Sequence, residues 1–158
     1  MSTEASTAVL VVDDQPIVTG LLKRMLGALG LTEVESASDG FEALALLRER
    51  RFALVIADIG MTPMTGLQLL RAMRADPTLK DVPVLIMTAR RDEAPHEEAR
   101  RARVNGYLTK PFTAETLREA IDRILALWGS QEKPANAKPG SEKPGKVQLG
   151  EVQPGRAA

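Results

Sequence analysis

Residues 54–66 read Leu-Val-Ile-Ala-Asp-Ile-Gly-Met-Thr-Pro-Met-Thr-Gly, an apolar run that stops at Asp58 and continues as a loop of Gly, Pro and Thr. A short apolar run bounded by breakers of regular structure is typical of a strand that is buried on both faces of a parallel sheet. In open α/β sheets the chemistry lies at the carboxyl ends of the strands. Taken alone, an aspartate after a strand is more commonly a turn or cap residue, so the interpretation of Asp58 as a reactive carboxylate depends on its neighbours.

The rest of the chain alternates predicted strands with predicted helices. The strands are expected at residues 8–12, 32–37, 54–58, 83–88 and 105–109, and the helices at 16–30, 38–47, 65–73, 92–103 and 113–129. Residues expected to lie on the apolar faces of these helices include Ile17, Val18, Leu22, Leu26, Phe41, Leu44, Leu47, Leu67, Leu70, Met73, Leu117, Ile121, Ile124, Leu125 and Trp128. Strict alternation predicts a doubly wound α/β domain with a five-stranded parallel sheet and five helices. We take its strand order to be 2-1-3-4-5, the common flavodoxin-like order.

Composition limits the function of such a domain. The chain has 158 residues, 44% of them apolar, and a domain of about 120 residues can bury a core. Lys plus Arg and Asp plus Glu each number 21, so no global field favours nucleic acid or anionic lipid. The absence of cysteine excludes disulfides and thiolate metal sites. We expect a cytoplasmic protein, because residues 1–7 do not resemble a signal sequence and no apolar run could span a bilayer.

Polar side chains follow four of the predicted strands. Asp13 and Asp14 end the first strand, Asp58 the third, Thr88 the fourth and Lys110 the fifth. Each has an ordinary interpretation as a cap, a surface lysine or a hydroxyl at a strand end. Placement at one edge of one sheet instead favours a single site.

A cluster of carboxylates at this edge would attract a cation. Asp13, Asp14 and Asp58 offer only oxygen ligands, which suit Mg²⁺ with open positions for water. A phosphoryl group on one carboxylate would share its charge with the ion and with the Lys110 ammonium, which is how phosphoryl transfer is stabilised. The Thr88 hydroxyl could donate a hydrogen bond to a phosphoryl oxygen.

Four stretches resemble the signature blocks of response regulator receiver domains. They are residues 11–16 (Val-Val-Asp-Asp-Gln-Pro), 58–66, 87–89 (Met-Thr-Ala) and 107–112 (Tyr-Leu-Thr-Lys-Pro-Phe), at the separations usual for that family. The resemblance covers about residues 7–128 and implies a switch in a two-component phosphorelay. It implies that Asp58 is the phosphoacceptor, that Asp14, Asp58 and the backbone carbonyl of Gly60 bind Mg²⁺, and that Asp13 helps through water.

The resemblance also implies roles for residues of the fourth and fifth strands. Lys110 would contact the phosphoryl group, and Thr88 and Tyr107 would form a switch pair. The Lys110–Pro111 peptide bond would be cis, which a bond before proline allows at modest cost. The donor would be a histidine kinase or a histidine phosphotransfer protein. A downstream protein would bind the surface of the last two predicted helices and the strand between them, on a monomer or weak dimer.

Three features depart from the family pattern. Thr62, followed by Pro63, stands where a proline is usual, so the loop after Asp58 is expected to take a different turn. Arg103 replaces the usual glycine before the fifth strand, which predicts a strained or differently terminated helix. That helix, expected at 92–103, is highly charged and carries few apolar residues, so we expect it to be weakly held.

The chain ends in a segment of different composition. From residue 131 a Lys-Pro pair recurs every five residues through Lys143, which predicts a disordered tail rich in Lys, Pro and Gly at 131–158. A receiver domain is expected at 7–130, after a flexible N-terminus at 1–6.

Two alternative functions remain open. One is an interaction module of receiver shape that is never phosphorylated. The other, a flavodoxin-like cofactor binder, would need a loop of backbone donors after the first strand, where Asp13 and Asp14 offer the opposite charge. In the phosphorelay interpretation, the protein is not a turnover enzyme but promotes its own phosphorylation and dephosphorylation at Asp58.

Overall fold

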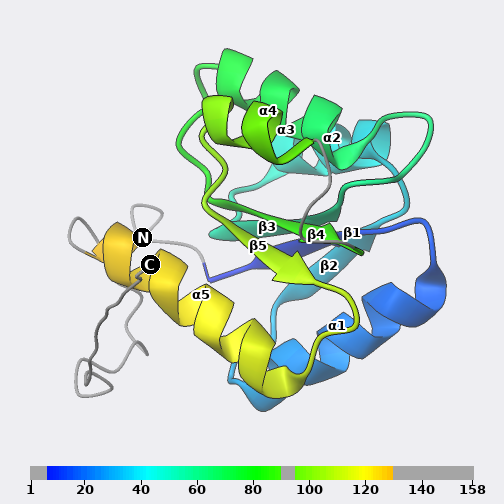
Figure 1. Ribbon diagram of the computed structural model, residues 1–158, viewed down its shortest axis with the longest axis vertical. Helices are drawn as coiled ribbons and strands as arrows, with labels where there is room; N and C mark the ends of the chain where they lie inside the picture. The colour runs from blue at the N-terminus through cyan, green and yellow to red at the C-terminus, as the bar shows by residue number, and fades with distance from the viewer. Residues whose placement is uncertain (1–6, 90–94, 130–158) are drawn as a thin grey trace.

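The structure is a computed structural model that describes residues 7–89 and 95–129. For residues 95, 96 and 125–129 it describes the backbone only. Its sheet has five parallel strands in the order β2-β1-β3-β4-β5, which confirms the predicted fold class and strand order (Figure 1). The predicted flexible N-terminus at 1–6 and disordered tail at 131–158 lie outside the described residues.

The ten elements alternate along the chain as predicted. The strands are β1 (Val9–Val12), β2 (Val34–Ala37), β3 (Leu54–Asp58), β4 (Val84–Thr88) and β5 (Gly106–Thr109), and the helices are α1 (Pro16–Ala28), α2 (Gly40–Glu49), α3 (Gly66–Ala75), α4 (Pro95–Arg101) and α5 (Ala114–Gly129). Within the described part of the chain, none of these helices has the length and apolar character needed to cross a bilayer.

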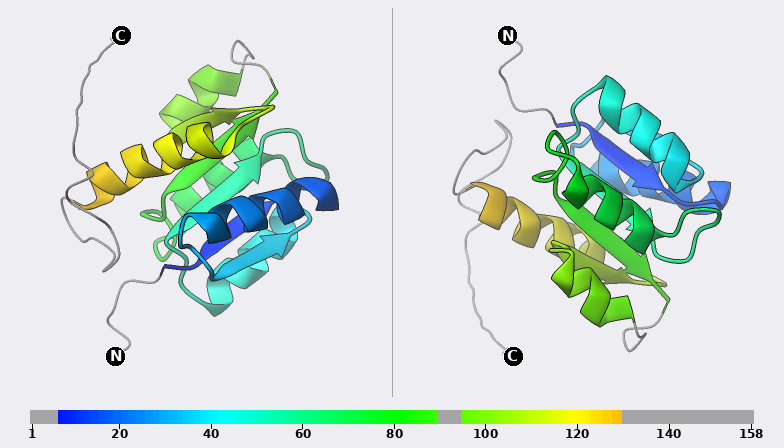
Figure 2. Two further views of the ribbon diagram at one scale, coloured as in Figure 1. Left: turned by 90° about the horizontal axis from the view of Figure 1, so that it is seen from below. Right: turned by 90° about the horizontal axis from the view of Figure 1, so that it is seen from above.

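Helices cover both faces of the sheet (Figure 2). On one face, α1 and α5 pack through Leu22, Leu26, Leu117 and Ile121 against alternate strand residues such as Ile56 and Met87. On the other face, α2, α3 and α4 pack against the intervening strand residues, for example Ile86. The four residues of β1 are all buried, as expected for a strand covered on both sides.

Helix caps fix where several helices begin. Asp39 accepts a hydrogen bond from the Glu42 amide at the start of α2, and Thr113 accepts one from the Thr116 amide before α5. Thr65 forms a reciprocal capping box with Gln68 at the start of α3. The α3 cap fixes the end of the loop that begins at Asp58.

Two predicted inward residues lie on the surface. Phe41 is 59% exposed and Ile17 is 84% exposed, so the prediction of an inward position is wrong for both. The buried face of α2 is Gly40, Ala43, Leu44 and Leu47, because Met64 fills the space where a side chain on Gly40 would lie. This contact rotates Phe41 out of the core. The predicted inward positions of Leu125 and Trp128 concern side chains outside the described part of the structure.

The end of α4 differs from its predicted bounds. The helix is described from Pro95 to Arg101, shorter than the expected 92–103, and the expected start at Asp92 lies outside the described residues. Arg103 itself adopts the left-handed conformation, with φ of 63°. The strain expected from the missing glycine is therefore present, because a side chain destabilises this conformation.

Candidate functional site

The sheet topology brings the predicted site residues to one edge. Val12 pairs with Ala57 and Asp58 pairs with Met87, so the ends of β1, β3 and β4 lie side by side. Thr88 pairs with Thr109, which places Lys110 just beyond the same edge. Gly66 supports this arrangement, since a Cβ there would collide with the carbonyl of Asp58.

Lys110 joins two of the three carboxylates. Its Nζ lies 2.7 Å from Asp58 Oδ1 and 3.3 Å from Asp13 Oδ2. Asp58 Oδ2 accepts a hydrogen bond of 3.2 Å from the backbone N–H of Gly60. The Asp58 side chain is only 15% exposed, so solvent screens this pair less than a surface ion pair.

Asp13 is the most buried of the three acids, with a side chain 1% exposed. Burial raises its pKa, and the charge of Asp58 acts in the same direction. The Gln15 backbone N–H, which donates at 2.9 Å, and the Lys110 ammonium oppose the rise without cancelling it. The folded protein therefore holds the negative charge of Asp13 at a cost, which a cation at this edge would relieve.

At Lys110 the acidic partners, and not burial, decide the direction of the pKa shift. Burial lowers its pKa, but the hydrogen bond to Asp58 and the charges of Asp58 and Asp13 outweigh burial, and the pKa is raised. Lys110 therefore remains an ammonium at neutral pH, a point charge held between two carboxylates.

Asp14 completes a group suited to a divalent cation. Its side chain is exposed to solvent at this edge of the sheet. One oxygen from each of Asp13, Asp14 and Asp58 lies within 4.8 Å of the others. Three carboxylates without a thiolate or imidazole are a donor set for a hard cation such as Mg²⁺. The residues present therefore fit the ion.

Thr88 and Tyr107 lie on adjacent strands. Thr88 is fully buried. Tyr107 pairs with Ile86 and packs into the core cluster that contains Ala99 of α4. By the alternation of side chains along a strand, both therefore lie on the α4 face of the sheet, on neighbouring strands. Partial burial raises the pKa of Tyr107, against the charge of Arg100, so the phenol is neutral.

Two loops at this edge contain cis peptide bonds before proline. The Lys110–Pro111 bond is cis, the geometry that the family resemblance implies. The Thr62–Pro63 bond is also cis, in the loop where the sequence departs from the family pattern. Met61, in the same loop, is fully buried.

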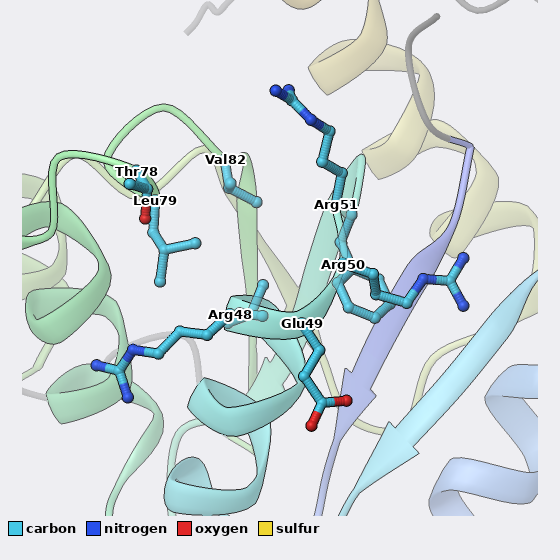
Figure 3. A pocket seen from close by; sticks show the side chains of 9 residues that line it. Arg48, Glu49, Arg50, Arg51, Thr78, Leu79 and Val82 are labelled. Atoms are coloured by element: carbon cyan, nitrogen blue, oxygen red, sulfur yellow. The ribbon is translucent and has the colours of Figure 1, made fainter. Parts of the chain in front are cut away.

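A cavity of about 570 Å³ lies at the opposite edge of the sheet, where β3 begins, and is distinct from this site. Figure 3 shows its labelled side chains Arg48, Arg50 and Arg51 pointing in three different directions. Arg50 pairs with Glu35 at 2.6 Å, and Arg48 lies 4.0 Å from Asp76. Since these guanidinium groups diverge, the labelled arginines do not form a convergent set of donors for an anion.

Sequence reasoning did not find the backbone donors of the site. The N–H groups of Gln15 and Gly60 each bond to the carboxylate two residues earlier. Such turns after an aspartate are common, and the sequence signal that could have indicated them is the position of each acid just before a loop.

Comparisons with known proteins agree with this geometry. The profile of the response regulator receiver domain family matches residues 9–122. The chain is 44% identical over 116 residues to the chemotaxis protein CheY of Pseudomonas aeruginosa, covering 73% of this chain and 94% of that protein. It is 42% identical over 116 residues to CheY-3 of Vibrio cholerae, covering 73% and 89%.

Solved structures give the same result. CheY4 of Vibrio cholerae superposes with a TM-score of 0.70 at 36% identity, covering 78% of this chain and all of that one. A sensor histidine kinase receiver domain of Pseudomonas aeruginosa, described with a magnesium ion in its active-site cleft, gives 0.68 at 28% identity, with 75% and 97% covered. By profile, sequence and structure, this chain belongs to the response regulator receiver family, whose members act in two-component signalling.

Proposed function

We propose that Asp58 accepts a phosphoryl group from a histidine kinase or a histidine phosphotransfer protein, with Mg²⁺ bound at the acidic cluster. The observation that supports this most directly is the Lys110 ammonium 2.7 Å from the Asp58 carboxylate, within a group of three acids. We place the protein in the cytoplasm, where such donors act, as a monomer or weak dimer.

In this proposal, each residue of the acidic cluster and its surroundings has a defined role. A carboxylate oxygen of Asp58 attacks the phosphorus, the bond from phosphorus to the donor breaks, and an acyl phosphate remains. Lys110 moves from its carboxylate partner to a phosphoryl oxygen and offsets the new charge. Mg²⁺ would supply the remaining positive charge. Asp14, Asp58 and the Gly60 carbonyl would hold the ion directly, and Asp13 would hold it through water.

The switch then depends on the face that Thr88 shares with Tyr107. A Thr88 hydroxyl that turns toward a phosphoryl oxygen leaves room behind it, and Tyr107 can fill that room from the next strand. Because Tyr107 packs in the cluster that contains Ala99, the movement would reach α4. The surface of α4, β5 and α5 would then change for a downstream protein or for phosphate relay.

Intact-mass spectrometry after incubation with acetyl phosphate and Mg²⁺ tests this proposal. We expect one phosphoryl adduct on the parent protein, none on Asp58→Asn, and none on the parent in EDTA. Asp81→Asn is a matched control, since Asp81 is 90% exposed and far from the cluster. An adduct on Asp58→Asn equal to that of the parent would show that another residue accepts the group. No adduct on the parent would favour an unphosphorylated interaction module.

A further inference from the structure

Arg74, in the last turn of α3, hydrogen-bonds to three other segments through its guanidinium group. Nε donates to the carbonyl of Ala102 at 3.2 Å, and Nη2 donates to the carbonyl of Arg103 and to Asn105 Oδ1, both at 2.9 Å. Nη1 donates to the carbonyls of Lys80 at 3.0 Å and Val82 at 2.9 Å. An arginine has five N–H groups, so its full donor capacity is used.

These acceptors are neutral oxygens, and Arg74 has no ion-pair partner among the described residues. The guanidinium is half-buried, and burial, together with the nearby charge of Arg103, lowers its pKa without removing its charge. Asn105 extends the connection, since its Oδ1 also accepts from the Val84 N–H at 2.8 Å. The group thus joins the end of α3, the loop before β4, the end of α4 and the start of β5.

The end of α4 needs such support. The Arg103 N–H bonds to the Arg100 carbonyl and the Val104 N–H to the Ala99 carbonyl, a helix ending that requires a left-handed residue at Arg103. A side chain strains that residue, and two of the carbonyls held by Arg74 lie beside or within the strained turn.

The rest of α4 has weaker connections to α3. Arg71 and Glu98 form an ion pair at 3.3 Å, with side chains 53% and 52% exposed. The helix pairs Arg100–Glu97 and Arg101–Glu97 are internal to α4 and also exposed. Exposed pairs contribute little to stability, so among the polar contacts of the described residues the strongest attachment lies at the C-terminal end of α4, while Ala99 packs in the core.

The topology places this attachment opposite the phosphorylation site. Parallel strands β4 and β5 start beside Arg74 and end beside Asp58. Helix α4 connects them, so it returns the chain from the edge where β4 ends to the edge where β5 begins (Figure 1). The first turn of α4 is therefore on the side of the acidic cluster, and its last turn is on the side of Arg74.

We propose that Arg74 is a positioning residue that fixes the C-terminal end of α4 in both the unphosphorylated and phosphorylated states. The response of α4 is then a swing of its first turn about a fixed last turn. The swing rests on the proposed function, whereas the fixed end does not. Arg74 acts through backbone carbonyls and takes no part in the chemistry at Asp58.

The first arm of the test uses the protein without a phosphoryl mimic. Arg74→Met keeps an unbranched, apolar stem and removes every donor, and Arg71→Met removes the exposed pair one turn earlier on the same helix. We expect amide hydrogen exchange at Val104 and Asn105 to be at least about tenfold faster in Arg74→Met, and within about twofold of the parent in Arg71→Met. Equal exchange in the parent and Arg74→Met would overturn the proposal.

If Arg74→Met does not fold, Arg74→Lys provides the same comparison. It keeps the positive charge but loses the planar fork that reaches several acceptors together. We expect intermediate exchange rates at the same amides. Exchange in Arg74→Lys equal to the parent would show that charge alone is sufficient, which contradicts a fixation by directed hydrogen bonds.

The second arm adds Mg²⁺ and beryllofluoride, a mimic of the phosphoryl group. In the parent, we expect shift changes in α4 to be largest at Glu97 and Glu98 and to fall toward Arg103. In Arg74→Met the changes should extend to Asn105, while the apparent affinity for beryllofluoride stays within about twofold, because an anchor present in both states has no coupling to the ligand. An affinity change above about tenfold would show that Arg74 favours one state and would overturn the fixed anchor. If the parent itself does not respond, the proposed function fails, and the first arm still reports on the anchor.

Discussion

Two cations lie at opposite edges of the same sheet and are held in different ways. Lys110 is bound by two carboxylates at 2.7 and 3.3 Å, at the edge where the strands end. Among the described residues, the hydrogen-bond acceptors of Arg74 are neutral oxygens, at the edge where β4 and β5 begin, and Asp81 acts on it only through its nearby charge. Both side chains are partly buried, so the difference lies in their partners.

The partners determine which cation can move. An ammonium makes rotatable, undirected contacts and can exchange a carboxylate for a phosphoryl oxygen without loss of charge compensation. A guanidinium that satisfies five acceptors at fixed angles cannot move without breaking several hydrogen bonds together, each worth about 0.5–1.5 kcal/mol net. In our proposal, the movable Lys110 therefore takes part in the switch, and the fixed Arg74 holds the end of α4 in place.

The largest expected effect concerns the movable cation. Lys110→Ala should fold and still bind the mimic weakly, but should lose most of the structural response, because no group then joins the phosphoryl group to the end of β5. Two-dimensional NMR with Mg²⁺ and beryllofluoride measures that response. A pattern of shift changes identical to that of the parent would remove Lys110 from the switch.

The fixed cation should have the larger effect on stability. Arg74→Met is expected to lower the free energy of unfolding by about 2–3 kcal/mol, because five acceptors, two part-buried and three exposed, lose their shared donor and water replaces it only in part. For Lys110→Ala in EDTA we expect about 1–2 kcal/mol, reduced on adding Mg²⁺, which replaces the missing charge. Urea denaturation of both variants with and without Mg²⁺ measures the difference. The reverse order of the two losses would contradict the comparison.

A smaller effect is expected at the strained turn that Arg74 supports. Arg103→Gly should raise the free energy of unfolding by about 1 kcal/mol, because glycine adopts a positive φ without strain. Gly30 ends α1 with the same hydrogen-bond pattern at φ of 94°. Gly30→Ala should accordingly destabilise by a similar amount, and urea midpoints of the two variants should move in opposite directions.

The smallest expected effect is the dependence of stability on pH through Asp13. Its raised pKa means that the folded state binds this proton more tightly than the unfolded state, so its ionisation reduces stability as the pH rises through that pKa. In EDTA at pH 7, Asp13→Asn should therefore be more stable than the parent. The gain should disappear at a pH where Asp13 of the parent is protonated, and a gain that does not depend on pH would contradict the assignment.

Much of the fold could be predicted from the sequence, because its signals are local. Apolar runs mark β1, β3 and β4, the alternation of elements places the more polar β2 and β5, and cap residues such as Thr65 and Thr113 mark helix starts. The strand order required the known regularity of this fold class. Phe41 was placed wrongly because the contact between Gly40 and Met64, which sets the rotation of α2, joins segments distant in the chain.

The site could be predicted for a similar reason, and the anchor could not. Each acid of the cluster immediately follows a strand, so one topological rule brings Asp13, Asp14 and Asp58 together. Arg74 follows no such rule, because its acceptors are backbone oxygens whose positions depend on the folded loops. The sequence correctly indicated few apolar residues in α4, but it gave no sign of the hydrogen bonds from Arg74 to the C-terminal end of that helix.

The central claim, that Asp58 carries the phosphoryl group and the edge of the sheet transmits the change, is tested most directly by two-dimensional NMR of the parent and Asp58→Asn. On adding Mg²⁺ and beryllofluoride, we expect shift changes in the parent at the acidic cluster, at Thr88 and Tyr107, and along the first turn of α4. Asp58→Asn should show none of them beyond the effect of Mg²⁺ alone. The same shift changes in both proteins, or changes in neither, would contradict the claim.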